Sequence, residues 1–116
     1  MLTLRLTNYL YGTVRVRVSG AFHSRLMAPA SERLARTLQE VAISPPRLPV
    51  VSNVTGKFIH AASEIRGLLV RQLTSPVLWD DSIRFLLAQG IRRFIEIGPG
   101  KVLTGLLKRI DPNLDG

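Results

Sequence analysis

The chain of 116 residues contains no cysteine and only two histidines. Without cysteine, disulfides and thiolate chemistry are excluded, and a cytoplasmic protein in a reducing environment is expected. With so few potential ligands, we also expect no dedicated metal site. No apolar run approaches the roughly 20 residues that would cross a bilayer. The opening apolar stretch is interrupted by Arg5, which argues against a secretory signal, so no membrane association is expected.

Acidic residues are scarce as well. Eight Asp and Glu stand against 16 Lys and Arg, which gives a net charge of +8. Such a surface attracts acidic partners. The arginines are scattered, however, and no aromatic residues are interleaved with them for base stacking, so we expect no nucleic-acid partner. An acidic protein or an anionic small substrate fits the charge equally well. The alternative is a solvated basic surface with no dedicated partner.

Against these absences, three segments carry strand patterns. Val14–Val18 alternates valine and arginine, the period of a half-buried strand. Two further short strands are predicted: Pro49–Val54 (PVVSNV), followed by a turn at Thr55-Gly56, and Arg92–Ile97 (RRFIEI), followed by the tight turn Gly98-Pro99-Gly100. Each is separated from the next by segments with a helical pattern.

Four helices are expected between and after these strands. Apolar residues at spacings of three and four predict helices at Met27–Ala42, at Glu64–Leu73 with Ser63 as its cap, from Asp80 or Asp81 to Gly90, and at Lys101–Ile110. Alternating strands and helices indicate an α/β fold with a mainly parallel sheet. Three strands with four helices are fewer than the usual five or six strands, and they would leave apolar faces uncovered. The chain therefore resembles a truncated part of a larger domain.

Two motifs invite a functional interpretation and fail. Gly98-Pro99-Gly100-Lys101 lies between a strand and a helix, but a phosphate-binding loop needs glycine where Ile95 stands and serine or threonine where Val102 stands. A tight turn is the simpler interpretation, although its backbone N–H groups remain candidates for holding a ligand at the helix N-terminus. No serine lies in the G-x-S-x-G pattern of a nucleophile elbow.

The remaining candidates are two histidines and a pair of aspartates. His23 follows a strand and precedes a helix, where a loop can present an imidazole to a cleft; a structural role is the alternative. His60 lies in a polar turn and is expected to be an exposed loop residue. Asp80 and Asp81 are adjacent, so in a helix their side chains point about 100° apart, and we expect helix capping rather than acid–base chemistry.

Four ordered blocks carry a family resemblance. They are VSGAFHSRLMAPA (Val18–Ala30), PVVSNVTG (Pro49–Gly56), IRGLLVRQLTSPVLW (Ile65–Trp79) and FIEIGPGKVLTGLLKRI (Phe94–Ile110). In order and spacing these blocks resemble the C-terminal part of bacterial, stand-alone malonyl-CoA:acyl-carrier-protein transacylases. The resemblance implies an acyltransferase core with an α/β-hydrolase-like fold over residues 14–116. Residues 1–13 match nothing in the family.

The resemblance also implies an activity and the residues that serve it. The family transfers malonyl from CoA, through a serine ester, to the phosphopantetheine thiol of an acyl carrier protein in fatty acid biosynthesis, with no cofactor of its own. His23 matches its general base, and Gln72 matches the residue whose main-chain carbonyl orients that histidine. Phe22 is expected in the substrate pocket, where its ring fills the space of an α-methyl and favours malonyl over methylmalonyl units. Asn53 is a second pocket candidate; a turn-forming role at a strand end is the alternative.

Departures from the family limit this expectation. The serine nucleophile, the oxyanion-hole glutamine and the arginine that binds the malonyl carboxylate precede the histidine block in the family, and none of them is found in this chain. We therefore expect the isolated chain to be inactive as a transferase. The alternatives are a non-catalytic fragment that binds acyl carrier protein, an acyltransferase piece of a polyketide synthase, and an unstable remnant without function.

Overall fold

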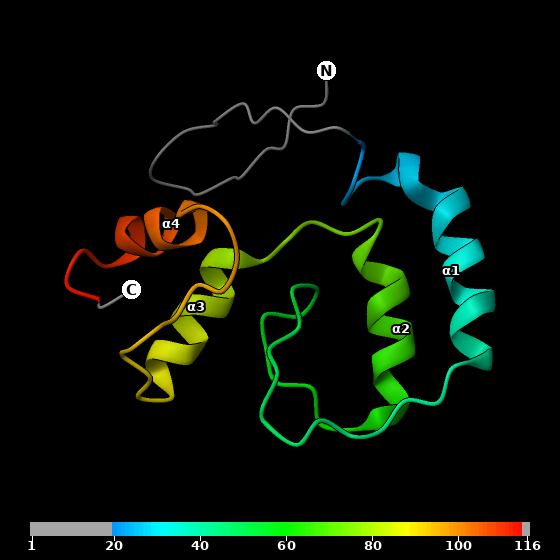
Figure 1. Ribbon diagram of the computed structural model, residues 1–116, viewed down its shortest axis with the longest axis horizontal. Helices are drawn as coiled ribbons and strands as arrows, with labels where there is room; N and C mark the ends of the chain where they lie inside the picture. The colour runs from blue at the N-terminus through cyan, green and yellow to red at the C-terminus, as the bar shows by residue number, and fades with distance from the viewer. Residues whose placement is uncertain (1–19, 115–116) are drawn as a thin grey trace.

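Four α-helices follow one another in the described part of the chain, residues 20–114 of a computed structural model (Figure 1). They are α1 (Ala28–Glu40), preceded by the short 3₁₀ turn η1 (Arg25–Met27), α2 (Ala62–Gln72), α3 (Trp79–Ala88) and α4 (Val102–Ile110). All four expected helices are present, with ends that differ from the expected ones by at most two residues. The strand expected at Val14–Val18 lies outside the described residues. None of the helices in residues 20–114 is long and apolar enough to cross a membrane.

The helices α1 and α2 form an antiparallel pair, lying side by side in Figure 1. Neither helix contains a buried residue. Pro29 falls in the first turn of α1, where its missing N–H costs nothing. The N-terminus of α2 is closed by Glu64, whose Oε1 accepts hydrogen bonds from the N–H groups of His60 (2.6 Å) and Ala61 (3.0 Å). The expected cap at Ser63 is therefore wrong, because the helix begins one residue before it.

The hydrophobic core of the described residues lies between α3, α4 and the segment after α4. Ile83, Leu107 and Leu114 are buried, and the partly buried side chains packed against them are Trp79, Leu87, Phe94 and Ile110. The apolar positions of α3 and α4 recur at helical spacing, so each helix turns one stripe toward this cluster. Gly90 ends the α3 region with a φ of 86°, a conformation that glycine adopts without strain.

Within residues 20–114 no strand is assigned, so the expected strands at Pro49–Val54 and Arg92–Ile97 are not confirmed there. Arg93, within the second segment, stands in a β-bridge. The first segment instead folds back on itself. Val51 makes an isolated antiparallel bridge with Phe58, supported by hydrogen bonds from Ser52 N to the Lys57 carbonyl (3.0 Å) and from Ile59 N to the Val50 carbonyl (2.9 Å). A strand is defined by a ladder of backbone bonds to a neighbour, and this hairpin is too short to provide one.

This hairpin packs against α3. The Phe58 and Phe85 rings meet edge to face with centroids 4.9 Å apart, and the N–H of Leu78 donates to the Asn53 carbonyl at 2.9 Å. Gly56, at a φ of 65°, approaches α3 so closely that an added Cβ would lie 3.2 Å from the Cβ of Asp81. Both the positive φ and the close approach require glycine at the turn.

The second expected strand is extended but lies open on one face. Its alternate side chains have different environments: Phe94 packs against the core, whereas Ile95 and Ile97 are 75% and 94% exposed. Among the described residues, no backbone hydrogen bond links Arg92–Ile97 to a parallel neighbour. The segment therefore has two different faces, as a strand would, but within residues 20–114 it forms no ladder.

Candidate functional site

His23 lies in a tight turn between the start of the described chain and η1. Its φ is 62°, in the left-handed region that residues other than glycine rarely adopt. Two hydrogen bonds in the adjoining turn hold this conformation: Ser24 Oγ donates to the Ala21 carbonyl at 2.6 Å, and Met27 N donates to the Ser24 carbonyl at 3.0 Å. Strained backbone of this kind persists only where surrounding contacts fix it, and it concentrates at functional sites.

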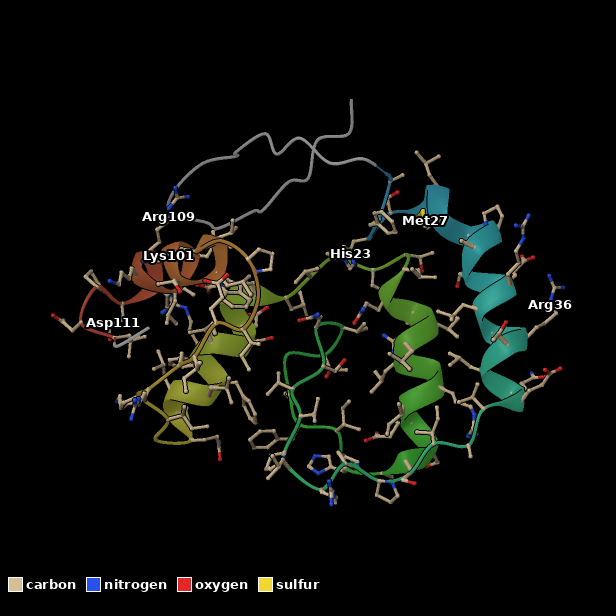
Figure 2. The ribbon with its side chains drawn as sticks, viewed as in Figure 1. His23, Met27, Arg36, Lys101, Arg109 and Asp111 are labelled. Atoms are coloured by element: carbon tan, nitrogen blue, oxygen red, sulfur yellow. The ribbon has the colours of Figure 1, made fainter. Side chains whose placement is uncertain are left out.

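The His23 ring contacts the end of α2. Its Nδ1 lies 2.8 Å from the main-chain oxygen of Gln72, the last residue of that helix. The carbonyls of a helix's last turn lack partners within the helix, so this oxygen is available to accept a proton from outside. When Nδ1 carries the proton, a neutral imidazole has its lone pair on Nε2. The ring is half-buried, and Figure 2 shows it beside the C-terminal end of α2.

Phe22 and Asn53 occupy different settings near this turn. The Phe22 side chain is 48% exposed, and its ring lies against Gly20 so closely that a Cβ there would sit 2.9 Å from it. Asn53 is half-buried in the hairpin turn, with its main-chain oxygen bonded to Leu78 N. No hydrogen bond within residues 20–114 joins the Asn53 side chain to His23. A hydrogen bond therefore brings Gln72, but not Asn53, to the histidine.

Several residues at the site were not anticipated from the sequence. Gly20 makes room for the Phe22 ring, and Ser24 closes the His23 turn. Ser31 in α1 donates from Oγ to the Val70 carbonyl of α2 at 3.2 Å. Arg66 in α2 donates to carbonyls at the end of α1. Ser24 directly follows the histidine, so its position could have indicated that it closes the turn. Ser31 and Arg66 gave no such signal, because a polar residue on an amphipathic helix usually faces solvent.

Two N–H groups in the first turn of α4 are already bonded to a carboxylate of this chain. The Glu96 carboxylate accepts from Leu103 N (3.0 Å), Thr104 N (3.0 Å) and Thr104 Oγ1 (2.7 Å). It thus occupies the position at the helix N-terminus where an anion would bind. The hydrogen bonds from Thr104, and then the one from Leu103, hold the pKa of Glu96 below its usual value of 4.5.

The other candidates are structural. His60 is exposed, and its main-chain N–H donates to the Glu64 carboxylate. Asp80 and Asp81 lie in the first turn of α3 without making a side-chain cap, so the expected capping role is wrong. Asp80 instead pairs with Arg84 one turn along, at 2.7 Å, in a partly exposed contact. Among the described residues, no three His, Asp or Glu side chains gather in a group that could hold a metal ion.

Sequence comparison finds close relatives, although no family model matches the chain. Over 101 residues it is 45% identical to the malonyl CoA-acyl carrier protein transacylase of Bacillus subtilis, covering 87% of this chain and 32% of the relative. The transacylase of Salmonella typhimurium is 50% identical over 93 residues, which are 80% of this chain and 30% of that protein. The polyketide biosynthesis protein ThaF of Burkholderia thailandensis is 47% identical over 106 residues, 91% of this chain but 9% of its own length.

The solved structures agree with the sequence relatives. Malonyl-CoA:acyl carrier protein transacylase from Xanthomonas oryzae superposes with a TM-score of 0.81 and 42% identity, over 88% of this chain and 32% of that one. A malonyl-transacylase in complex with a type II polyketide acyl-carrier protein gives a TM-score of 0.82 and 44% identity, over 88% and 33%. These neighbours are α/β acyltransferases, which confirms the α/β class but not the detail of three strands.

In each of these comparisons the match covers most of this chain but only a small part of the other protein. The chain spans about a third or less of the length of the relatives and solved structures reported above. Identities of 42–50% and matching folds extend over most of this chain. By sequence and by fold, this chain is a homologue of the malonyl-CoA acyl carrier protein transacylases, corresponding to their C-terminal third.

Proposed function

We propose that this chain supplies the general base of an acyl-carrier-protein S-malonyltransferase, and that His23 is that base. The observation that carries the proposal is the 2.8 Å contact between His23 Nδ1 and the Gln72 carbonyl. A neutral carbonyl fixes the tautomer with Nε2 as the proton acceptor, as an aspartate would in a serine triad. It does so without placing a negative charge beside an anionic substrate. The carbonyl end of α2 also carries a partial negative charge, which favours the imidazolium formed during proton transfer.

The reaction requires Nε2 to accept a proton and return it twice. A serine oxygen attacks the malonyl thioester carbonyl while Nε2 takes the serine proton, and CoA leaves as its thiol after receiving that proton. The phosphopantetheine thiol then loses its proton to Nε2 and attacks the malonyl-serine ester, and the serine oxygen recovers the proton. General-base help of this kind contributes about 10²- to 10⁴-fold to the rate.

Neither Ser24 nor Ser31 is a candidate for the nucleophile of this reaction. The hydroxyls of Ser24 and Ser31 donate to main-chain carbonyls, and no serine of the chain lies in a G-x-S-x-G elbow. Such an elbow is what exposes a serine oxygen for attack. We infer that the isolated chain does not transfer malonyl groups and that the serine must come from the remainder of a transacylase fold.

Malonyl-CoA and an acyl carrier protein are the proposed substrates, and fatty acid biosynthesis is the proposed pathway. The transferase domain is proposed to span residues 14–116. One structurally similar transacylase is in complex with an acyl-carrier protein. The net charge of +8 would speed encounter with an acidic carrier. Phe22, half-exposed beside His23, is proposed to favour malonyl by occupying the volume of an α-methyl, and Asn53 to line the same pocket.

A chimera tests this function. Residues 20–114 would replace the matched segment of the Bacillus subtilis transacylase, and malonyl transfer from malonyl-CoA to acyl carrier protein would be measured. The unmodified transacylase is the positive control, and the isolated chain is the negative control. We expect the chimera to transfer malonyl and the isolated chain to be inactive. A folded chimera without activity, or transfer by the isolated chain, would contradict the proposal.

A polyketide pathway is the second candidate, favoured by the 47% identity to ThaF, a polyketide biosynthesis protein. The same chimera distinguishes the pathways, because it can be offered carriers from fatty acid and polyketide systems in separate assays. A kcat/KM at least tenfold higher for the polyketide carrier would favour this candidate. Salt-sensitive binding of the isolated chain to either carrier, with no transfer by the chimera, would instead favour a non-catalytic binding fragment.

A further inference from the structure

The contact between α1 and α2 is made by hydrogen bonds from side chains to main-chain carbonyls. Ser31 Oγ in α1 donates to the Val70 carbonyl at 3.2 Å, near the end of α2 that holds Gln72. At the other end, the Arg66 guanidinium of α2 donates from Nε to the Leu38 carbonyl (2.7 Å) and from Nη2 to the Val41 carbonyl (2.5 Å). The His23 and Ser31 contacts lie near the C-terminal end of α2, and the Arg66 contacts lie at the C-terminal end of α1.

Apolar packing between these helices is incomplete. Neither α1 nor α2 contains a fully buried residue, and apolar side chains such as Leu34 and Leu68 are only half-buried, so packing alone holds the alignment of the two helices weakly. The carbonyls that accept from Arg66 belong to the last turn of α1 and its C-terminal cap, where backbone groups lack helical partners. A guanidinium fork at that place fixes both direction and distance.

The position of α1 determines where His23 lies. Only Ser24 and the short turn η1 separate the histidine from the first turn of α1 (Figure 2). Its backbone is held at a φ of 62°, so the turn has little freedom to compensate for movement of the helix. A shift of α1 along α2 therefore moves the imidazole relative to the Gln72 carbonyl.

We propose that Ser31 and Arg66 are positioning residues for His23, anchoring α1 to α2 at both ends so that the imidazole meets the Gln72 carbonyl. The catalytic consequence rests on the function proposed above; the geometric claim does not. Ser31 fixes the near end of the helix pair and Arg66 the far end. Neither residue has to touch the substrate.

The test measures the His23 ring in the full chain by ¹⁵N–¹H nuclear magnetic resonance. The nitrogen shifts report which ring nitrogen carries the proton, and hydrogen exchange reports how well Nδ1–H is protected. Ser31→Ala removes the hydroxyl while placing a better helix former in α1, so loss of helix cannot explain an effect. Arg66→Lys keeps the charge but loses the fork. Ser31→Thr restores a hydroxyl and should restore the wild-type ring signal.

Two controls lie on the same helix. Thr37→Ala removes a hydroxyl bonded within α1, to the Arg33 carbonyl at 3.2 Å. Arg36→Lys changes an exposed arginine that projects from α1 on the side away from α2 (Figure 2). Circular dichroism and thermal unfolding of each variant show whether it remains folded.

We expect Nδ1–H exchange to become about tenfold faster in Ser31→Ala and Arg66→Lys, with a mixed tautomer population, and to stay unchanged in both controls. An unchanged ring in folded Ser31→Ala and Arg66→Lys would overturn the proposal. An equal effect in Thr37→Ala, or no recovery in Ser31→Thr, would also overturn it, because the effect would then be general loosening of α1. If the ring moves but the chimera carrying the same substitutions keeps its kcat, positioning stands and the catalytic role of His23 fails.

Discussion

The imidazole of His23 is held by a main-chain atom, because Nδ1 lies 2.8 Å from the carbonyl oxygen of Gln72. The side chain of Gln72 takes no part in this contact. Gln72→Ala in the chimera should therefore leave kcat for malonyl transfer within about threefold of the parent value, the range of a substitution that removes no essential contact. Steady-state kinetics check this. A loss of a hundredfold or more would mean that the amide side chain itself serves the reaction.

The Phe22 ring is expected to control the size of the acyl group. Phe22→Ser opens the space beside His23, and exclusion of one methyl group is worth roughly 10- to 200-fold in kcat/KM. The ratio of kcat/KM for methylmalonyl-CoA to that for malonyl-CoA should rise by that order in the chimera. The exposed Leu26 provides the control: Leu26→Ala removes a similar apolar volume from η1 and should leave the ratio unchanged. A constant ratio in Phe22→Ser would rule out the pocket role.

Gly20 lies against the same Phe22 ring. A Cβ at this position would lie 2.9 Å from a Phe22 ring atom, closer than side chains tolerate, so Gly20→Ala should displace the ring. We expect shifted aromatic resonances for Phe22 and, in the chimera, a change of selectivity in the same direction as Phe22→Ser. Gly105→Ala is a suitable control, because a Cβ there meets nothing within 4 Å.

The Glu96 cap makes the N-terminus of α4 sensitive to acid. Its pKa is lowered in the folded state from 4.5, first by the two hydrogen bonds from Thr104 and then by Leu103. Because the folded pKa lies below the unfolded one, the cap stabilises the protein above pH 4.5 and this contribution is lost as the pH falls through the folded pKa. Glu96→Gln should lower the midpoint of thermal unfolding above pH 4.5, and the difference from wild type should shrink in more acidic solution.

Glu64 provides the comparison for that measurement. Hydrogen bonds from Ala61 and then His60 lower its pKa in the same direction. Glu64→Gln should therefore show the same sign of pH dependence, but with loss of protection at the start of α2 instead of α4 in residue-resolved hydrogen exchange. A Glu96→Gln defect that stays constant with pH would show that the carboxylate charge is unimportant at the cap.

Leu107 tests the α3–α4 core. It is 3% exposed and packs with Ile83 and Leu114. Leu107→Ala should cost about 2–5 kcal/mol in the free energy of unfolding, since it removes buried methyl groups and leaves a cavity. Val102→Ala, at an exposed position of the same helix, should stay within about 0.5 kcal/mol. Chemical denaturation measures both. Equal, small losses would show that this cluster does not stabilise the chain.

The sequence predicted the helices well because their signal is local. Apolar residues at helical spacing mark one face of α1, α3 and α4 whatever surrounds them. The strands expected at Pro49–Val54 and Arg92–Ile97 were not confirmed within residues 20–114, because a strand is assigned only where a neighbour shares a ladder of backbone bonds. Phe94 packs against the core while Ile95 is exposed, but different environments on two faces do not by themselves make a strand.

Prediction of the site also succeeded where the signal was in the sequence and failed where it depended on contacts between distant residues. The GAFHS block singled out His23, and the family resemblance paired it with Gln72, residues that are far apart in the sequence. The left-handed backbone of His23 could not be anticipated, because the residue is not glycine. The contacts of Ser31 and Arg66 were equally hidden, since each looks like an ordinary polar residue on a helix. The Glu96 cap was missed because its partners lie beyond a glycine turn that suggested a ligand instead.

The most direct test of the account is the kcat of the chimera carrying His23→Ala. We expect a fall of about 10²- to 10⁴-fold with the fold retained, as for loss of a general base. His60→Ala, which removes the second and exposed histidine, should leave kcat unchanged. A folded His23→Ala chimera that transfers malonyl at the parent rate would contradict the central claim that His23 is the base.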